Sequence, residues 1–247
     1  MRLIFWDCET SPNTAYSFNT YKAYIAPNQI IEPSRIICWA AKERGSRTIH
    51  YADERGGHKK MIQELHKILS DADGIVTYNG VSFDQKVANA EFVKYGLTPI
   101  PPTKQIDLYR TVKKCFRFPS GKLEYVSHAL GIGEKVKHQG FQLWKDCLAG
   151  DEKAWATMTK YNKQDCKLLE SLYDKLLPWL TNPPNRSLEA EATCCPACGS
   201  ENLQRRGNYR TKVASYSRFC CKDCGAWSRS RISDVHPDNR QAIMVSL

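Results

Sequence analysis

The pattern of apolar and polar residues over the first 180 positions predicts alternating strands and helices. Four segments have the β-branched and aromatic composition of strands: LIFWDCE, RIICWAAKE, TIHYAD and GIVTYNG. Other segments repeat apolar residues at helical spacing: KKMIQELHKILSDA, SFDQKVANAEFVKYG, GKLEYVSHALGIG and a long helix from about Asp151 to Leu180. This alternation predicts an α/β or α+β sheet domain.

The segment that follows the long helix reads as a linker. It contains two adjacent prolines and several small polar residues, TNPPNRSLEAEAT, which stop regular structure. We therefore expect three parts: a sheet domain over 1–180, a linker over 181–192 and a small module over 193–247 that is rich in cysteine. We name residues 193–247 the cysteine module.

Composition limits the class of protein. The chain has 247 residues, of which 42% are hydrophobic and 25% charged, as in soluble globular proteins. No apolar run approaches the roughly 20 residues that span a bilayer, and too few apolar residues precede Asp7 for a secretion signal. We expect a cytoplasmic protein with no membrane partner. A net charge of +10 favours a polyanionic partner, although a generally basic surface has the same charge.

Two acids end the first predicted strand. Because side chains alternate faces along a strand, Asp7 and Glu9 share a face at its carboxyl end. Neighbouring carboxylates repel, and each raises the pKa of the other. A hard divalent cation such as Mg²⁺ between them removes that cost. The pair therefore predicts a metal site, provided that other segments supply further ligands.

Two later segments supply such groups. In TYNGVSFDQ, an apolar strand leads through Asn79 to Asp84 at the start of a helix, where an acid is also a common helix cap. In KYNKQDCKLLE, Tyr161 and Asp165 are four residues apart in the long helix and so share one face. Each segment alone also fits an ordinary cap or a solvated polar stripe.

The three segments together, DxE, NGxxFD and YxxxD in this order, resemble the DEDD superfamily of 3′→5′ exonucleases in its tyrosine subtype. The second and third segments are similar to those of the proofreading domains of family B DNA polymerases. The resemblance covers about residues 1–180. It implies an RNase H-like fold, in which helices flank a central mixed sheet, and hydrolysis of phosphodiester bonds with two Mg²⁺ or Mn²⁺ ions about 4 Å apart.

The resemblance also implies roles for the matching residues. Asp7 would bridge the two ions, Glu9 and Asp165 would complete the first metal site, and Asp84 would hold the second ion through water. Tyr161 would orient the attacking water, since a phenol with a pKa of about 10 is a poor base at neutral pH.

Three more residues lie in or near these motifs. Asn79 and Phe83 match positions near the substrate strand in such exonucleases, although Phe83 also suits the core, which we favour slightly. Asp107, in QIDLYR, is a further acid for which we expect a structural role.

The cysteine module contains two CxxCG motifs, CPACG and CKDCG. Cys195 and Cys198 of the first pair with Cys221 and Cys224 of the second, with 22 residues between the pairs. Four thiolates at this spacing predict a closed, structural Zn²⁺ site in a zinc ribbon. Cys194 and Cys220 directly precede the motifs and leave the register open, and disulfides are the competing reading.

The module has nine lysines and arginines against four acids, a net charge of +5. Arginines such as Arg210 alternate with rings such as Trp227, a composition that suits phosphate contacts and base stacking. We expect these two residues to contact nucleic acid, although some rings must form the core of so small a module. Docking on a polymerase or replication protein is a second use for the module.

The sequence leaves several functions open. A 3′→5′ exonuclease on single-stranded DNA is the first, and an exoribonuclease fits the same motifs because discrimination rests on contacts to the 2′-hydroxyl group. A structure-selective repair nuclease is the third. A zinc-ribbon nucleic-acid-binding protein with an inactive nuclease scaffold is the fourth, and the presence of all four acids and Tyr161 argues against it.

Overall fold

The computed structural model describes residues 1–19, 21, 24–181 and 183–245; Asn182, within the predicted linker, lies outside this part. The chain divides into two compact units, Arg2–Tyr173 and, together with Met1, Asp174–Leu247. Within the described ranges, no helix combines the length and apolar character that crossing a membrane requires.

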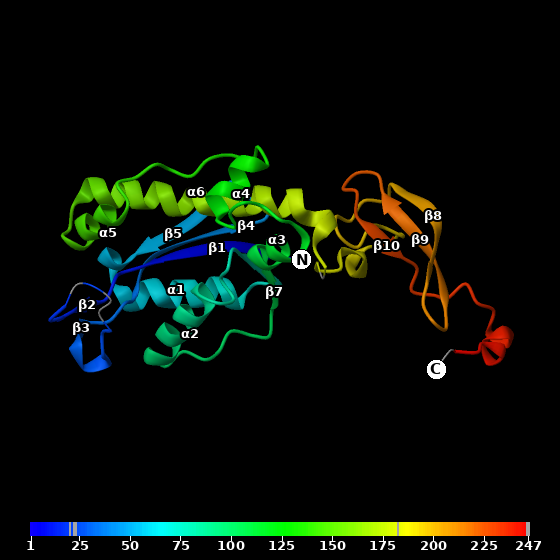
Figure 1. The fold of residues 1–247 in the computed structure, drawn as a ribbon, viewed down its shortest axis with the longest axis horizontal. Coiled ribbons are helices and arrows are strands. Elements are labelled where there is room, and N and C mark those ends of the chain that lie inside the picture. The colour runs from blue at the N-terminus through cyan, green and yellow to red at the C-terminus, as the bar shows by residue number, and fades with distance from the viewer. Residues whose placement is uncertain (20, 22–23, 182, 246–247) are drawn as a thin grey trace. The chain divides into compact units, whose positions relative to one another are not determined.

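The first unit is built on a mixed sheet. Among the described residues, its strands follow the order β5-β4-β1-β6-β7 (Figure 1). Strand β1 is antiparallel to β4 and parallel to β6, and β6 is parallel to β7. The strand bounds are β1 Leu3–Thr10, β4 Ile36–Glu43, β5 Ile49–Asp53, β6 Gly74–Thr77 and β7 Lys104–Asp107. A separate short pair joins β2 Thr14–Ala15 to β3 Ile30–Glu32.

Helices cover both faces of this sheet. Helices α1 and α2 lie on one face, and α5 and α6 lie on the other (Figure 1). The bounds are α1 His58–Ser70, α2 Asp84–Lys94, α3 Leu108–Cys115, α4 Leu123–Ala129, α5 Phe141–Leu148 and α6 Glu152–Leu176. A mixed central sheet flanked by helices confirms the predicted fold class.

The alternation of side chains along the strands divides the core in two. Trp6 and Trp39 pack with Leu65 and Phe92, from α1 and α2, on one face of the sheet. On the other face, a second cluster joins strand β4 to α5 and α6: Ile37, Cys38, Leu143, Cys147, Ala154, Trp155, Met158 and Tyr161. The two clusters hold the sheet between its helices. The second cluster includes Tyr161 of α6, one helical turn before Asp165.

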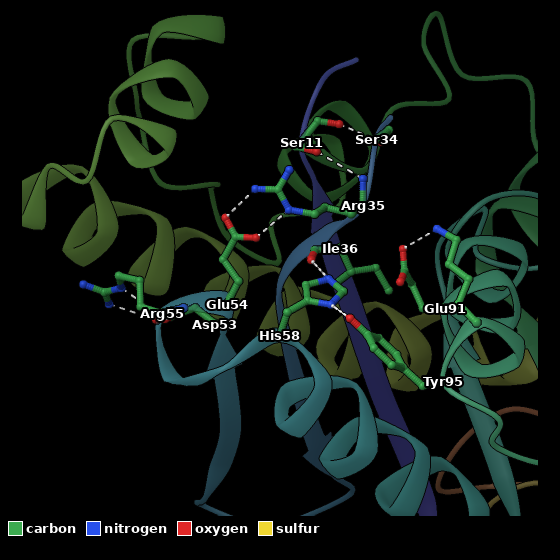
Figure 2. Close-up of polar contacts among 11 residues, drawn as sticks. Ser11, Ser34, Arg35, Ile36, Asp53, Glu54, Arg55, His58, Glu91 and Tyr95 are labelled. Atoms are coloured by element: carbon green, nitrogen blue, oxygen red, sulfur yellow. Dashed lines mark hydrogen bonds and ion pairs between the residues drawn. The ribbon is translucent and has the colours of Figure 1, made fainter. Parts of the chain in front are cut away.

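Polar contacts hold the edge where β1 ends and β4 begins (Figure 2). The Arg35 guanidinium donates to both carboxylate oxygens of Glu54, at 2.8 and 3.1 Å. The His58 ring lies 2.7 Å from the Tyr95 hydroxyl and 2.9 Å from the carbonyl oxygen of Ile36, which ties α1 to β4. The Arg35 N–H donates to Ser11 Oγ at 3.1 Å. The contact between Ser11 and Arg35 holds the chain two residues after Glu9.

Some predicted elements differ from the structure. The long helix ends at Leu176 and continues as a 3₁₀ turn, Leu177–Trp179, because Pro178 interrupts the α-helical hydrogen bonds. The expectation that the linker forms no element is wrong, because Arg186–Glu189 forms a 3₁₀ turn capped by the Asn185 side chain. Strand β7 and helices α3 and α5 were not predicted, since each is short and the first carries little apolar sequence.

The second unit contains a small antiparallel sheet. Among the described residues its strand order is β10-β9-β8, with bounds β8 Leu203–Arg210, β9 Ser215–Cys221 and β10 Trp227–Arg229. A 3₁₀ turn, Pro237–Ala242, follows the sheet. The two CxxCG motifs flank strands β8 and β9 in the sequence, so the strand pairing brings them together.

Candidate active site

Strand β1 directs Asp7 and Glu9 toward helix α6. Phe5, on the same strand face, packs edge-on against Tyr173 of α6, with ring centroids 5.6 Å apart. The alternate residues Trp6 and Cys8 lie in the cluster on the opposite face. The predicted common face of Asp7 and Glu9 is therefore the face that α6 covers.

Helix α6 brings its own acid to the same place. Asp165 is only 2% exposed, and Tyr161 lies one helical turn before it. One carboxylate oxygen each from Asp7, Glu9 and Asp165 lie within 4.8 Å of one another. Three acids from the first strand and the last helix of the unit thus form one cluster, which we name the carboxylate cluster.

Asp84 reaches this region from the start of α2. Strand β6 pairs with β1 only through Phe5, so the Cys8 N–H lies beyond that pairing. Asp84 Oδ1 accepts a hydrogen bond from this N–H at 3.3 Å and another from Cys8 Sγ at 3.3 Å. Asp84 is 6% exposed and raises the pKa of Asp7, so it lies beside the carboxylate cluster without being one of its three members.

Burial and mutual repulsion raise the pKa values of these carboxyl groups. Burial raises the pKa of Asp7 most, and Asp84, Glu9 and Asp165 raise it further. Burial, followed by repulsion from Asp165, raises the pKa of Glu9 to about 8. Burial is also the largest cause of the raised pKa values of Asp84 and Asp165. These groups need a neighbouring positive charge to be ionised together at neutral pH.

A lysine supplies part of that charge. Lys135 Nζ donates to Asp165 Oδ2 at 2.5 Å and to the Tyr161 hydroxyl oxygen at 3.1 Å. Its charge lowers the pKa values of Asp7, Glu9 and Asp165, against the larger effect of burial. Burial and the Asp165 charge raise the pKa of Tyr161, so its phenol stays protonated at neutral pH.

A cleft of about 870 Å³ opens over the site. Asp7, Tyr161 and Asp165 line it together with a set of basic residues: Lys122, Lys135, Lys137 and His138. The aromatic rings of Tyr78 and Tyr109 also line it, next to Asn79. The cleft therefore combines acidic side chains, which can bind metal cations, with basic side chains, which can bind phosphate groups. This arrangement suits a nucleic-acid backbone.

The substrate residues predicted from the second motif are placed differently. Asn79 lines the cleft with a left-handed backbone (φ 66°), and its N–H donates to Asp107 Oδ1 at 2.8 Å. Asp107 is buried and also caps α3, which agrees with the structural role expected for it. Phe83 is 47% exposed as the residue before α2, so the slight preference for a core position was wrong. It is not among the described residues that line the cleft.

One comparison with known proteins agrees with the fold. The sequence model that describes the RNase_H superfamily matches residues 36–177, more than half of the chain. The chain belongs to the RNase_H superfamily. Its mixed sheet is therefore RNase H-like, as the sequence predicts. The matched range includes Asp84, Tyr161 and Asp165 but starts after the strand that carries Asp7 and Glu9.

A second comparison supports the fold of this RNase_H superfamily member. The structure of the family B DNA polymerase from the hyperthermophilic archaeon Pyrobaculum calidifontis is similar, with a TM-score of 0.56 and 18% identity. The similar region covers 72% of this chain and 24% of that polymerase. At this identity the likeness concerns the fold alone. No curated protein matches the chain. Superfamily and fold together support a nuclease-type function.

Sequence reasoning missed two residues of the candidate site. The Asn162 side chain, fully buried, donates from Nδ2 to Asp7 Oδ2 at 2.9 Å and orients that carboxylate. Its only signal in the sequence is its position between Tyr161 and Asp165. Lys135 has no signal, since the segment between α4 and α5 has no helical or strand periodicity.

The second unit brings four cysteines together. Sulfur atoms of Cys195, Cys198, Cys221 and Cys224 all lie within 4.8 Å of one another. Cys195 Sγ lies 3.7 Å from Cys224 Sγ, and Cys198 Sγ lies 3.6 Å from Cys221 Sγ. A disulfide requires about 2.05 Å, so these are not disulfides. Tetrahedral thiolates about 2.3 Å from a zinc ion would be separated by about 3.8 Å. The cluster is therefore compatible with a zinc ribbon.

The two module residues predicted to contact nucleic acid are both exposed, but they do not share a face. Trp227 pairs with Cys220, and Arg210 pairs with Ser215. Cys220 and Ser215 are an odd number of residues apart on strand β9, so their side chains point to opposite faces of the sheet.

Proposed function

We propose that this RNase_H superfamily protein is a metal-dependent 3′→5′ exonuclease of the DEDD tyrosine subtype, acting on single-stranded DNA ends. The observation that carries the proposal is the carboxylate cluster of Asp7, Glu9 and Asp165, of which Asp7 and Asp165 line a cleft together with Tyr161 and basic side chains. The mixed sheet flanked by helices and the superfamily are those that the resemblance implies.

The donor set fits two Mg²⁺ or Mn²⁺ ions. All the donors are carboxylate oxygens, which hard divalent ions prefer. Asp165 Oδ1 is buried without a hydrogen-bond partner among the described residues, so it offers a vacant acceptor. Asp7, Glu9 and Asp165 would hold one ion, and Asp7 with Asp84 the other. Such ions supply the acidification of water and the charge neutralisation that phosphodiester hydrolysis needs.

The residues of the chain have separate tasks in this proposal. Tyr161, whose phenol stays protonated, orients the attacking water by hydrogen bonding and does not take its proton. Asn162 fixes the direction of Asp7. Lys122 and Lys137, both in the cleft, hold phosphates of the substrate strand. Asn79 lies where it can contact the terminal nucleotide.

We also propose that Cys195, Cys198, Cys221 and Cys224 hold one structural Zn²⁺ ion. The sulfur separations support it, and all four tetrahedral positions are then filled by protein, which leaves none for catalysis. Reduced thiols at these positions suit the cytoplasm. In this proposal the nuclease domain covers 1–180, the linker 181–192 and the zinc ribbon 193–247.

A degradation assay tests the proposed activity. DNA and RNA strands carrying a 5′ label, single-stranded or in duplex, are incubated with the zinc-bound protein and Mg²⁺ or Mn²⁺. We expect a ladder of shortening labelled products on single-stranded DNA. We expect no products from an internally labelled circular single-stranded DNA, which has no ends. Cleavage of the circle contradicts exonuclease action. Faster loss of RNA assigns an exoribonuclease instead, and faster loss of duplex assigns a repair-type specificity.

A further inference from the structure

One face of the small sheet gathers arginines and aromatic rings. Strand pairing places Tyr209 opposite Tyr216, and Arg218 opposite Arg229. Residues opposite each other in a sheet share a face, as do residues two apart on a strand. The members of this face, which we name the arginine–aromatic face, are Tyr209, Tyr216, Arg218, Trp227 and Arg229.

The guanidinium groups of this face lie against its rings. The Arg229 guanidinium carbon lies 4.0 Å from the ring centroid of Tyr216 and 5.6 Å from that of Tyr209. The Arg218 guanidinium carbon lies 5.0 Å from the ring centroid of Trp227. Such contacts keep each arginine close to the sheet and hold a cation beside an aromatic surface.

The rings remain open to a ligand. Tyr209 is 47% exposed and Trp227 is 58% exposed, although large rings usually bury most of their area. Arg218 donates from Nε to the carbonyl oxygen of Arg206 at 3.0 Å, which fixes its direction and leaves further N–H donors on the same guanidinium. The face therefore offers fixed cations and free aromatic surface together.

The opposite face of the sheet is occupied differently. Leu203 and Phe219 lie there and line a cavity of the second unit together with Leu180, and Trp227 and Arg229 of the edge strand β10 line it as well. The Asp234 carboxylate also lies there, where it accepts from Ser217 Oγ at 3.2 Å. Core contacts and an acid thus belong to the opposite face. The rings of Tyr209 and Tyr216 do not line this cavity, and Trp227, which does, remains 58% exposed.

The charge of the strands favours a polyanion. Strands β8, β9 and β10 contain five arginines and no aspartate or glutamate. An acidic protein would satisfy the arginines alone. A single nucleic-acid strand satisfies both features, because its phosphates pair with guanidinium groups while its bases stack on exposed rings. Duplexes keep their bases stacked within the helix and would leave Trp227 and Tyr209 unused.

We propose that the arginine–aromatic face binds single-stranded nucleic acid, with Arg218 and Arg229 on phosphates and Trp227 and Tyr209 stacked on bases. This binding site is separate from the carboxylate cluster and does not depend on cleavage.

Fluorescence anisotropy tests the proposal with the full, zinc-bound chain and no added Mg²⁺ or Mn²⁺. The probes are labelled 20-nucleotide dT and rU strands, a 20-base-pair duplex and a poly-glutamate peptide. The variants are Trp227→Ala and the double change Arg218→Gln with Arg229→Gln. Arg210→Gln is the control for the loss of a single arginine, since it removes one charge from the same sheet but on the opposite face.

Each variant has its own expected result. The double arginine variant loses two phosphate contacts, which reduces the magnitude of the slope of log affinity against log salt concentration by about 1.4. We also expect this variant to bind dT or rU strands at least tenfold more weakly. Trp227→Ala weakens binding about fivefold or more and leaves the slope unchanged. Arg210→Gln changes affinity less than twofold. Zinc content and melting temperature show whether each variant is folded. If Trp227→Ala does not fold, the double arginine variant still tests the proposal, because both of its changes are at exposed positions.

Three results would overturn the proposal. The first is the same affinity in the wild type and the double arginine variant. The second is an equal loss in Arg210→Gln, which indicates diffuse charge and no specific face. The third is tighter binding of poly-glutamate than of the single strands, which assigns the face to a protein partner. None of them depends on nuclease activity, so the proposed function is tested separately.

Discussion

The ammonium group of Lys135 lies 2.5 Å from Asp165 Oδ2. The same group lies 5.0 Å from the centroid of the Tyr161 ring. A single positive charge thus touches the acid and the phenol that the proposed mechanism requires. The side chain of Lys135 is 21% exposed, and that of Asp165 is 3% exposed. In the metal-free protein this lysine offsets part of the repulsion within the carboxylate cluster.

Replacing Lys135 should therefore favour metal binding. In Lys135→Met, the carboxylate cluster loses a competing cation, so we expect Mn²⁺ to bind several-fold more tightly. We also expect the metal-free protein to lose about 1.5–3 kcal/mol of stability, the range for a hydrogen bond to a charged group. Calorimetric titration with Mn²⁺ and urea unfolding measure the two effects. Lys137→Met is the matched control in the same cleft; an equal gain in affinity there would refute a specific role for Lys135.

The stability of the metal-free protein should fall as pH rises. The pKa of Glu9 in the folded chain is about 8, against a usual 4.5. A raised folded-state pKa contributes stability that is complete below about 4.5 and is lost as pH rises through 8. Each pKa unit corresponds to about 1.4 kcal/mol. Urea unfolding at several pH values should show a smaller decline in Glu9→Gln than in the wild type.

Added metal should reverse this decline. At pH 8, Mg²⁺ at a hundredfold excess over its dissociation constant should restore about 2.7 kcal/mol in the wild type. We expect much less in Glu9→Gln, which has lost a ligand. Parallel pH profiles in the two proteins, or a stability that Mg²⁺ does not change, would count against the assigned site.

Asn162 should act through Asp7. In Asn162→Ala, the Asp7 carboxylate loses the hydrogen bond from Asn162 Nδ2, at 2.9 Å. Changes of this kind beside a ligand reduce metal affinity or activity about 10- to 100-fold. Thr159→Ala, on the same helix, is a control, because its hydroxyl donates to the Trp155 carbonyl oxygen and not to an acid. If both variants bind Mn²⁺ equally, the contact does not position the ligand.

Loss of one thiolate should unfold the zinc ribbon. Cys198→Ser should remove zinc and, with it, the protection of amide hydrogens in β8 and β9, because so small a sheet depends on its metal. Amides of β1 and β4 should remain protected. Cys220→Ser is the control, since Cys220 lies outside the four-cysteine cluster. Zinc retained in Cys198→Ser but lost in Cys220→Ser would mean that the register of ligands is shifted.

Simple periodicities explain why the acids could be predicted. The alternation of a strand places Asp7 and Glu9 on one face whatever the rest of the fold, and helical spacing does the same for Tyr161 and Asp165. The core stripe of α1 was equally predictable, and Met61, Ile62, Leu65 and Leu69 are buried. The local pattern does not show that this face of the strand meets this face of the helix. That prediction came from the family resemblance.

Contacts that depend on tertiary structure could not be predicted. Lys135 belongs to a segment without periodicity, and its position becomes defined only when that segment packs beside α6. Phe83 has core-like chemistry, but its place just before α2 leaves it exposed. In the second unit, composition led to one prediction for Arg210 and Trp227, that both contact nucleic acid. Only the register of the strands shows that the two side chains lie on opposite faces of the sheet.

The most direct test of the carboxylate cluster as a catalytic centre is single-turnover cleavage of a 5′-labelled DNA strand by Asp165→Asn. This change keeps the shape of the side chain and removes one charge from the cluster. Glu152→Gln, an exposed change at the start of the same helix, is the control. We predict that the wild type and the control cleave with Mg²⁺, and that Asp165→Asn is at least a hundredfold slower although it binds the strand normally. Equal rates in all three proteins would contradict the assignment of catalysis to this cluster.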